Sequence, residues 1–296
     1  MAIINFGSVN IDHVYQVDHF VQPGETIAST SYHCLLGGKG ANQSVALAKA
    51  SSDVRHVGKI NESDTRFKQA LIKQGVNCKY LACTETPSGH AIIQVTPSGE
   101  NAIVLFGGAN QELDGKDVME ALDDTKPSDW VLTQNETSAI DQVLNQAKEK
   151  GLKVAFNPAP MTESVKHLPH DCIDLLIVNK VEAEEISGRQ DLDKMEAYFR
   201  QDWPDTEVLI TLGKAGVRML KKDRTIDVPA FEVEAVDTTA AGDTFIGFFL
   251  SAYANHSEAS SALRRACAAS ALAVMQMGAA QSIPNEEQVN RFLAKQ

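Results

Sequence analysis

The chain has 296 residues, of which 43% are hydrophobic and 22% charged, so its composition is that of a folded globular protein, not a disordered or collagen-like one. Its 27 Lys and Arg against 39 Asp and Glu give a formal net charge of −12, which makes nucleic acid and anionic membranes poor partners because both select clustered basic side chains. The charge, taken alone, also argues against a polyanionic ligand.

Cysteine usage and the N-terminus bear on the cellular compartment. Five cysteines, an odd number, form no C-x-x-C pair, so we expect neither a disulfide framework nor a structural zinc site. The first residues carry no basic segment of a leader, and no run of about 18 apolar residues could span a membrane. We therefore expect a cytoplasmic protein that binds no membrane.

Strand-like and helix-like segments alternate along the chain. Short β-branched runs predict strands at Ile3–Phe6, Val54–Val57, Trp130–Thr133, Val154–Asn157, Leu175–Val178 and Val208–Thr211. Helical patterns lie at Gly40–Lys49, Thr65–Gln74, Thr137–Lys150 and Ala241–Asn255. This alternation predicts an α/β sandwich around a mainly parallel sheet that is covered on both faces.

Two pieces of the chain interrupt this alternation. Strand-like segments at Val14–Phe20 and Ile27–Tyr32 have no helix between them, and Thr96-Pro-Ser-Gly99 joins Ala91–Val95 to Ala102–Phe106 as a hairpin. We interpret both pieces as a small β lid attached to the α/β body; the alternative is an edge extension of the main sheet.

Two polar motifs lie near the N-terminus. Asn10 and Asp12, two residues apart after the first strand, would point the same way and could bind sugar hydroxyls, although an Asx turn is the commoner explanation. Gly37-Gly-Lys-Gly-Ala-Asn-Gln43 would let a polar ligand approach the backbone closely, yet alone it is equally compatible with a flexible turn.

The strongest motif is Asp237-Thr-Thr-Ala-Ala-Gly-Asp-Thr-Phe245, which opens a long apolar helix. Small residues before a helix leave its first N–H groups open to a ligand, and a helix N-terminus favours anions. Asp243 could instead simply cap the helix, but a cap does not require the preceding Ala-Ala-Gly.

Several common enzyme motifs are absent. The sequence contains no G-x-x-x-x-G-K-[ST], no G-x-G-x-x-G, no G-x-S-x-G and no H-E-x-x-H. The first two absences argue against a Walker-type nucleotide site and an NAD-linked enzyme. We expect His167-Leu-Pro-His170 to be a loop, not a metal site.

Taken together and in order, these motifs resemble the ribokinase branch of the PfkB-type carbohydrate kinases. The resemblance runs from Ile3 to about Phe292. Its further marks are Gly107-Gly-Ala-Asn110, Asn157-Pro-Ala-Pro160, Asn179-x-x-Glu182 and Thr211-Leu-Gly-Lys-Ala-Gly216. The resemblance implies one α/β domain over residues 1–296, a three-layer αβα sandwich whose β lid is formed near residues 13–35 and 86–107. It also implies a homodimer that pairs through the lid.

The resemblance implies a role for each matching position. The sugar hydroxyls would be held by Asn10, Asp12, Gly38, Lys39, Asn42 and Glu136. The nucleotide would be bordered by Asn179, Thr211, Gly213, Gly216, Gly242 and Cys267. Mg²⁺ would be served through water by Glu182, and K⁺ would be held by Asp237, Thr239, Ala273, Gln276, Gly278 and Ser282. Asp243 would be the general base and would also contact the sugar, beside an anion hole made by the backbone of Ala240, Ala241, Gly242 and Asp243.

The sequence departs from the family pattern in three places. Lys180 and Val181 replace the usual pair inside the Asn-x-x-Glu segment, Gln276 stands where Arg is common, and Cys267 stands where His is common beside the adenine.

The implied reaction is transfer of the γ-phosphoryl group of ATP to the primary hydroxyl of D-ribose, with the sugar and ATP as small-molecule partners. Deoxyribose, fructose or a nucleoside are alternative substrates within the class. Asn10, Asp12 and Glu136 favour a small sugar over a nucleoside, which would want aromatic stacking. From another class, a catalytically inactive sugar sensor is the alternative, against which the presence of Asp243, Gly242 and Lys39 argues.

Overall fold

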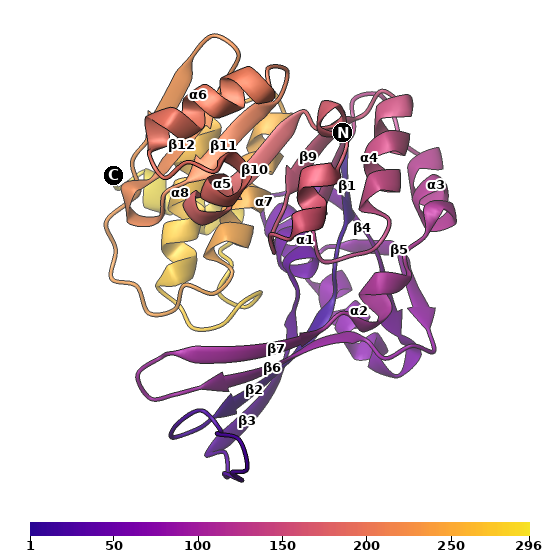
Figure 1. Cartoon of the computed structure of the whole chain (residues 1–296), viewed down its shortest axis with the longest axis vertical. Coiled ribbons are helices and arrows are strands. Elements are labelled where there is room, and N and C mark those ends of the chain that lie inside the picture. Colours follow the sequence, from indigo (N-terminus) through magenta and orange to yellow (C-terminus); the bar gives the residue numbers. More distant parts are fainter.

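Nine strands form one large sheet in a computed structural model that describes residues 1–296 (Figure 1). Their spatial order is β13 (Thr225–Val228), β12 (Val217–Leu220), β11 (Glu207–Thr211), β10 (Leu175–Asn179), β9 (Lys153–Asn157), β8 (Trp130–Gln134), β1 (Ala2–Phe6), β4 (Asp53–Asn61) and β5 (Asn77–Thr84). The seven strands from β11 to β5 pair in parallel, and only β12 and β13 pair antiparallel. The predicted mainly parallel sheet is therefore confirmed.

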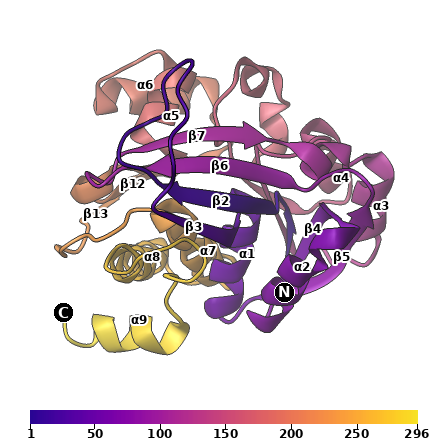
Figure 2. The ribbon, with the colours of Figure 1, turned by 90° about the horizontal axis from the view of Figure 1, so that it is seen from below.

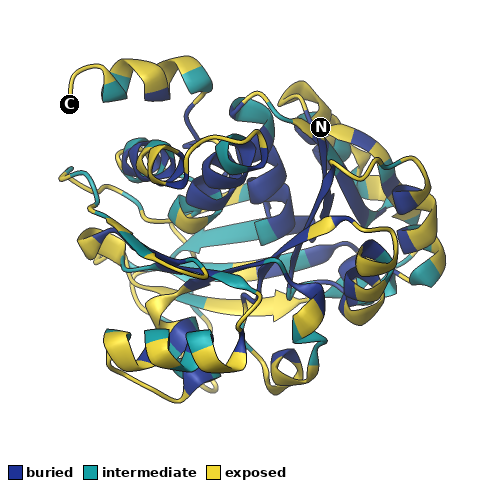
Figure 3. Ribbon diagram, turned by 90° about the horizontal axis from the view of Figure 1, so that it is seen from above, coloured by how far each residue is buried: buried dark blue, intermediate teal, exposed yellow.

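Helices cover both faces of this sheet and bury two separate cores. On one face lie α1 (Lys39–Lys49), α2 (Thr65–Lys73), α7 (Ala241–Ala254) and α8 (Ala259–Val274), with α9 (Glu286–Leu293) against α8. On the other face lie α3 (Gly115–Asp123), α4 (Ile140–Glu149), α5 (Lys180–Ser187) and α6 (Leu192–Asp202). Along β1, Ile3 joins the first core while Ala2, Ile4 and Phe6 join the second, so the strand is apolar apart from the buried Asn5. Figure 3 shows the buried residues on the inner sides of the helices and the exposed ones outside.

Four strands form a second, smaller sheet that projects from the body (Figures 1 and 2). Its order is β3 (Ser31–Gly37), β2 (Asn10–Gln16), β6 (Gly89–Val95) and β7 (Asn101–Phe106). Parallel pairing of β2 with β6 joins the two segments that lack helices, and the Thr96–Gly99 turn closes the β6–β7 hairpin with a left-handed Gly99. The small sheet is separate from the main one, so the edge-extension alternative is wrong.

Several predicted boundaries are wrong. The first two strands of the small sheet are β2 and β3, not Val14–Phe20 and Ile27–Tyr32, and residues 18–30 between them contain no strand. The polar Asn10 and Asp12 hid the start of β2, because polar side chains do not indicate a buried strand, although Asn10 is buried and Asp12 half-buried there. The helix predicted from Thr137 begins at Ile140, after a left-handed Ala139. The sequence analysis also left strands β5, β12 and β13 and helices α3, α5, α6, α8 and α9 unassigned.

The longest helix, α8, has 16 residues. None of the helices has both the length and the apolar character needed to cross a membrane.

Candidate active site

Four neighbouring strands of the main sheet each end in a polar residue at the same edge. Gln134, Asn157, Asn179 and Thr211 are the last residues of β8, β9, β10 and β11. The register places Gln134 beside Asn157, and Asn179 beside Thr211. Ligands of open α/β sheets bind outside the carboxyl ends of the strands, so this edge is where a site is expected.

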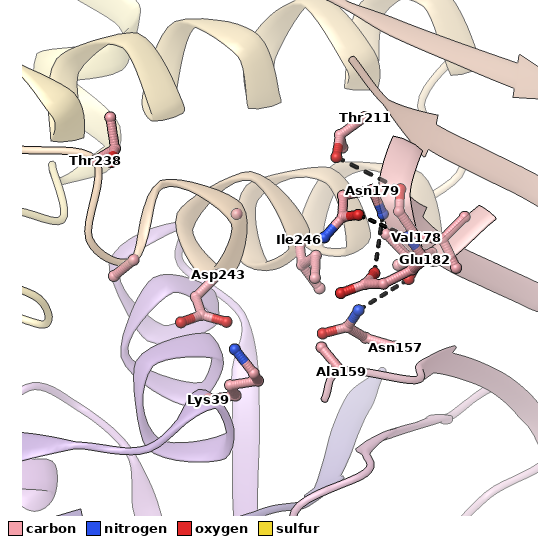
Figure 4. A pocket seen from close by; sticks show the side chains of 13 residues that line it. Lys39, Asn157, Ala159, Val178, Asn179, Glu182, Thr211, Thr238, Asp243 and Ile246 are labelled. Atoms are coloured by element: carbon pink, nitrogen blue, oxygen red, sulfur yellow. Dashed lines mark hydrogen bonds between the residues drawn. The ribbon is translucent and has the colours of Figure 1, made fainter. Parts of the chain in front are cut away.

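A cavity of about 240 Å³ lies between this edge and the N-terminus of α7 (Figure 4). Asn157, Asn179 and Thr211 line it from the sheet, and Gly242 and Asp243 line it from the helix. Lys39, the first residue of α1, and Glu182 of α5 complete its polar wall. Two motifs 200 residues apart in the sequence thus meet across one small space.

The first turn of α7 has free N–H donors and room for a ligand. Ala240 is left-handed (φ 57°), and its side chain provides no cap. The Ala241 N–H donates to the Thr238 carbonyl at 3.3 Å, whereas the N–H groups of Gly242 and Asp243 have no backbone acceptor. A Cβ added at Gly242 would meet no atom within 4 Å, so this glycine is not needed to avoid a clash within the protein. Open donors at the positive end of a helix dipole form a cradle for an anion.

Asp243 does not cap α7; its carboxylate is held by α1. The Asn42 amide donates to Oδ2 at 3.0 Å, and the Gln43 amide donates to Oδ1 at 3.0 Å. Desolvation raises the pKa of Asp243 and outweighs the opposing effects of Lys39, Gln43 and Asn42. An aspartate with a raised pKa that faces a cavity is a stronger base than an exposed one.

Lys39 points toward Asp243 at one side of the cavity, with Asn157, Asn179 and Glu182 at the other side (Figure 4). Burial lowers the pKa of the Lys39 ammonium, but the carboxylates of Asp243, Glu136 and Glu182 outweigh burial and raise it. Lys39 is therefore a fixed positive charge among three carboxylates, placed to neutralise a bound anion or to donate to a hydroxyl.

The residues predicted to hold the sugar converge where the small sheet meets the body. Asn10 is buried and accepts from Asn110 at 2.7 Å, while Asp12 lies so close to Gly37 that any Cβ there would overlap its carboxylate. Desolvation, with the nearby charge of Glu136, raises the pKa of Asp12 to about 6. The Asx-turn alternative for Asn10 and Asp12 is wrong, since both lie in β2.

Glu136, in the loop after β8, holds the glycine-rich segment, and Gly38 in that segment sets the start of α1. The Glu136 carboxylate accepts from the Lys39 N–H at 3.0 Å and from the Ser8 hydroxyl. Gly38 is left-handed (φ 91°) and is the N-cap of α1, where a side chain would press on Asn10 and Ser8. The glycine-rich segment is thus a fixed helix start and not a flexible turn.

Asn179 and Glu182 form a reciprocal cap at the start of α5. The Asn179 side chain accepts from the Glu182 N–H at 2.9 Å, and Glu182 Oε2 accepts from the Asn179 N–H at 2.9 Å. Glu182 Oε1 has no partner in the protein, and desolvation raises the Glu182 pKa. No group of three His, Cys, Asp or Glu side chains could hold a metal directly, whereas one carboxylate among amide and hydroxyl oxygens suits a water-coordinated Mg²⁺.

A second cavity of about 600 Å³ adjoins the first and shares Thr211, Thr238 and Gly242 with it. Gly213, Gly216 and Cys267 line the larger cavity, as predicted for the nucleotide, while Asn179 lines only the smaller one. The larger cavity has an apolar wall made by Phe231, Phe245, Ala271 and Val274. It has the size and the lining to take a planar base, and it leads directly to the α7 N-terminus.

The residues predicted for a monovalent cation come together as two adjoining loops. Asp237 accepts from Thr239 (N–H at 2.8 Å, hydroxyl at 2.6 Å) and from the Gly278 N–H at 2.9 Å. Burial raises the pKa of Asp237, but these three hydrogen bonds outweigh burial and lower it. The Asp237 N–H donates to Val274, next to Ala273, while the Ser282 hydroxyl turns to Ala279. An ionised carboxylate between two carbonyl-rich turns has the donor chemistry of a cation site.

The sequence analysis missed a group of buried amides behind Asp243. Asn5, Gln134 and Asn157 form with Gln43 one hydrogen-bonded group, and Asn110 supports Asn10. A signal was present: Gln134 and Asn157 are polar residues that end apolar strand runs, where apolar residues would be expected if only packing mattered.

Comparisons with known proteins show the family of this chain. The model of the family described as "pfkB family carbohydrate kinase" matches residues 2–286 of the chain. A ribokinase of Haemophilus influenzae is 36% identical over 300 residues, covering 97% of this chain and 96% of the relative. A deoxyribokinase of Salmonella typhi is 31% identical and covers 99% of each chain. The structure of an Arabidopsis thaliana ribokinase complexed with ribose and ATP superposes with a TM-score of 0.88, at 28% identity over 99% of this chain and 98% of that chain. A ribokinase structure from Thermotoga maritima superposes with a TM-score of 0.87, at 33% identity over 99% of each chain.

Proposed function

This chain belongs to the pfkB family of carbohydrate kinases and is an ATP-dependent sugar kinase, and we propose that it phosphorylates the primary hydroxyl of D-ribose with Asp243 as the general base. The observation that carries the base assignment is the position of the Asp243 carboxylate in the first turn of α7, inside the cavity and next to free helix N–H groups. Phosphoryl transfer needs an oriented hydroxyl, a proton acceptor and charge stabilisation, and these lie together there.

The sugar is oriented by residues of the small sheet and of the glycine-rich segment. Asn10, Asp12 and Glu136 offer hydrogen-bond acceptors, and the Lys39 ammonium and Asn42 amide offer donors. This set suits a compact molecule with several hydroxyl groups. Asp243 then takes the proton of the primary hydroxyl while the oxygen of that hydroxyl attacks the γ-phosphorus and ADP leaves.

The backbone of Ala240 to Asp243 receives the charge of the transferring group. Its N–H groups are fixed before substrate arrives, so no reorganisation is needed during the reaction. Lys39, beside Asp243, adds a full positive charge to the cavity (Figure 4). The nucleotide base would occupy the larger cavity beside Cys267, Gly213 and Gly216, with its phosphates passing Thr211 and Asn179.

Glu182 would hold Mg²⁺ through water, and the Asp237 loops would hold K⁺. Mg²⁺ supplies charge neutralisation of the phosphate oxygens when it is bound. The chain contributes a Glu182 whose one oxygen is fixed by the α5 cap and whose other oxygen is free. A monovalent cation between the Asp237 and Gly278 loops would stabilise the segment that leads into the anion hole.

Deoxyribose is the second candidate substrate, because a deoxyribokinase covers the whole chain at 31% identity. The two sugars differ by one hydroxyl. If acceptors such as Asp12 and Asn10 bind that hydroxyl in ribose, deoxyribose would leave one of these polar groups unpaired, and the site would distinguish the two sugars. A coupled assay of ADP release with ribose, deoxyribose and fructose, each with and without K⁺, tests the substrate and the cation together. If another sugar has a higher kcat/KM than ribose, that sugar and not ribose is the substrate.

We propose further that the small sheet is a lid that closes over the sugar and excludes water, and that two copies pair through it. Its strand β7 exposes Ile103, Val104, Leu105 and Phe106 in one run. An apolar edge strand is rarely left uncovered in a soluble monomer. We therefore expect a second copy of the chain to cover β7.

The cytoplasm is the proposed location. All five cysteines are free, and Cys78 and Cys267 are buried, which fits a reducing compartment. Subcellular fractionation with an antibody against the native protein checks this.

A further inference from the structure

Gln43 is the only side chain that joins Asp243 to the buried interior. It is fully buried, and its amide nitrogen donates both to Asp243 Oδ1 at 3.0 Å and to Asn157 Oδ1 at 3.2 Å. Its oxygen accepts from Gln134 Nε2 at 2.8 Å. Both hydrogens and the oxygen of this amide are therefore used.

The orientation of the Gln43 amide is fixed from two sides by backbone carbonyls, which can only accept. On one side, Asn5 Nδ2 donates to the Gly40 carbonyl at 2.8 Å, so Asn5 Oδ1 must face Gln134, whose amide then donates at 2.9 Å. The same Gln134 nitrogen donates to Gln43, which must therefore present its oxygen there. The Gln43 nitrogen is left for Asp243.

The second side leads to the same orientation. Asn157 Nδ2 donates to the Ile177 carbonyl at 2.9 Å, so Asn157 Oδ1 must face Gln43 and needs a donor from it. Gln43 cannot flip without breaking hydrogen bonds at both ends. Apart from Gln134 Oε1, which has no partner, the amides of this group satisfy one another, and breaking one of these bonds would cost a further desolvation.

Asn42, which holds the other oxygen of Asp243, is not fixed in this way. Its Nδ2 donates to Asp243 Oδ2 at 3.0 Å, but its Oδ1 has no partner in the protein. Asn42 can turn toward a sugar without breaking a second bond, whereas Gln43 cannot.

We propose that Gln43 is a positioning residue: it holds Oδ1 of Asp243 permanently and thereby leaves Oδ2 as the oxygen that takes the sugar proton. This inference rests on the proposed role of Asp243 as base. Gln43 also opposes protonation of Asp243, because its hydrogen bond favours the charged carboxylate. Without that donor, the carboxyl group rotates and stays protonated to higher pH.

The test is the rate of a single turnover, measured by rapid quench with Mg-ATP and ribose between pH 4.5 and 8. In Gln43→Met the donor is lost, and we expect the acid limb to move up by about half to one pH unit, with a plateau rate about tenfold lower and a sugar KM within about threefold. In Gln43→Glu the side chain keeps an acceptor for Gln134 but places a second carboxylate beside Asp243, so the limb should move up by more than one unit.

Ser44→Ala is the matched control. Ser44 is the next residue of α1, equally buried, and it accepts from Asn5 and bonds His56 at the far end of the same group without touching Asp243. We expect it to lower thermal stability and leave the acid limb unmoved. If the acid limb of Gln43→Glu lies within about 0.2 pH unit of that of wild type, the proposal is overturned. This result decides even if Gln43→Met fails to fold.

A second readout does not depend on turnover. Titration of the Asp243 carboxyl by ¹³C NMR, assigned with Asp243→Asn, should show a higher midpoint in Gln43→Met than in wild type without any substrate. A wild-type protein that forms no ADP with any sugar overturns the proposed function, whereas an Asp243 midpoint that does not move overturns this inference.

Discussion

Gly247 of α7 lies against Ala46 of α1 so closely that a Cβ on the glycine would overlap the Ala46 Cβ. One turn earlier on each helix, Gln43 and Asp243 are joined by a hydrogen bond. The close crossing of the two helices therefore sets the distance over which the glycine-rich segment can hold the base. It explains why a glycine stands within the apolar run of α7, where helix propensity alone disfavours it.

Gly242→Ala separates a ligand role for the α7 N-terminus from a structural one. Because the added methyl group would meet no protein atom within 4 Å, we expect an unfolding free energy within about 1 kcal/mol of wild type. The methyl group would project into the space shared by both cavities, so kcat/KM for ATP should fall by about tenfold or more. Thermal melting and steady-state kinetics check this, and an unchanged kcat/KM would remove Gly242 from the anion hole.

Glu182→Gln keeps the α5 cap and removes the charge. The amide oxygen can still accept from the Asn179 N–H, so the melting temperature should change little. We expect the Mg²⁺ concentration needed for half-maximal rate to rise about tenfold or more. Glu185→Gln, at an exposed position of the same helix, is the control; its charge acts on Glu182 only weakly, so it should change the Mg²⁺ dependence far less than Glu182→Gln does. Equal effects of the two variants would contradict the assignment.

Sugar binding should weaken in acid because of Asp12. Its pKa of about 6 means that it is ionised above that pH and protonated below it, and only the ionised form accepts with both oxygens as a charged group and donates no hydrogen bond. The sugar KM of wild type should therefore rise as the pH falls through 6, while Asp12→Asn should have a higher KM without that step. A flat wild-type KM between pH 5 and 8 would show that Asp12 does not bind the sugar in its ionised form.

Pairing through the small sheet is tested by sedimentation at micromolar concentration. Wild type should sediment at twice the monomer mass, and Val104→Lys should sediment as a monomer, since Val104 is 68% exposed on the apolar strand β7. Met119→Lys, at a similarly exposed apolar position on α3, should leave the dimer intact. A monomeric wild type, or a dimer unaffected by Val104→Lys, would exclude this interface.

The sequence predicts the layered α/β fold and most of the polar residues at its site, because apolar runs report burial and glycine-rich turns report close backbone approach. It did not reveal Gln43, Gln134 and Asn157 as one group, since their hydrogen bonds join residues 91 and 114 positions apart. The net charge of −12 also argued wrongly against a polyanionic ligand, because it says nothing of the α7 N-terminus and Lys39, which we propose as a local site for phosphate. The small sheet was placed correctly but its first strands were not, because Asn10 and Asp12 are polar although Asn10 is buried and Asp12 half-buried in β2.

The central claim is that Asp243 takes the proton of the sugar hydroxyl. A coupled ADP-release assay of wild type and Asp243→Asn with ribose and Mg-ATP tests it most directly, with ribose affinity measured by calorimetry in both proteins. Asp243→Asn keeps the size of the side chain, so we expect ribose to bind within about tenfold of wild type while kcat falls by about 10²–10⁴. An Asp243→Asn protein that retains more than a few per cent of the wild-type kcat would contradict the account.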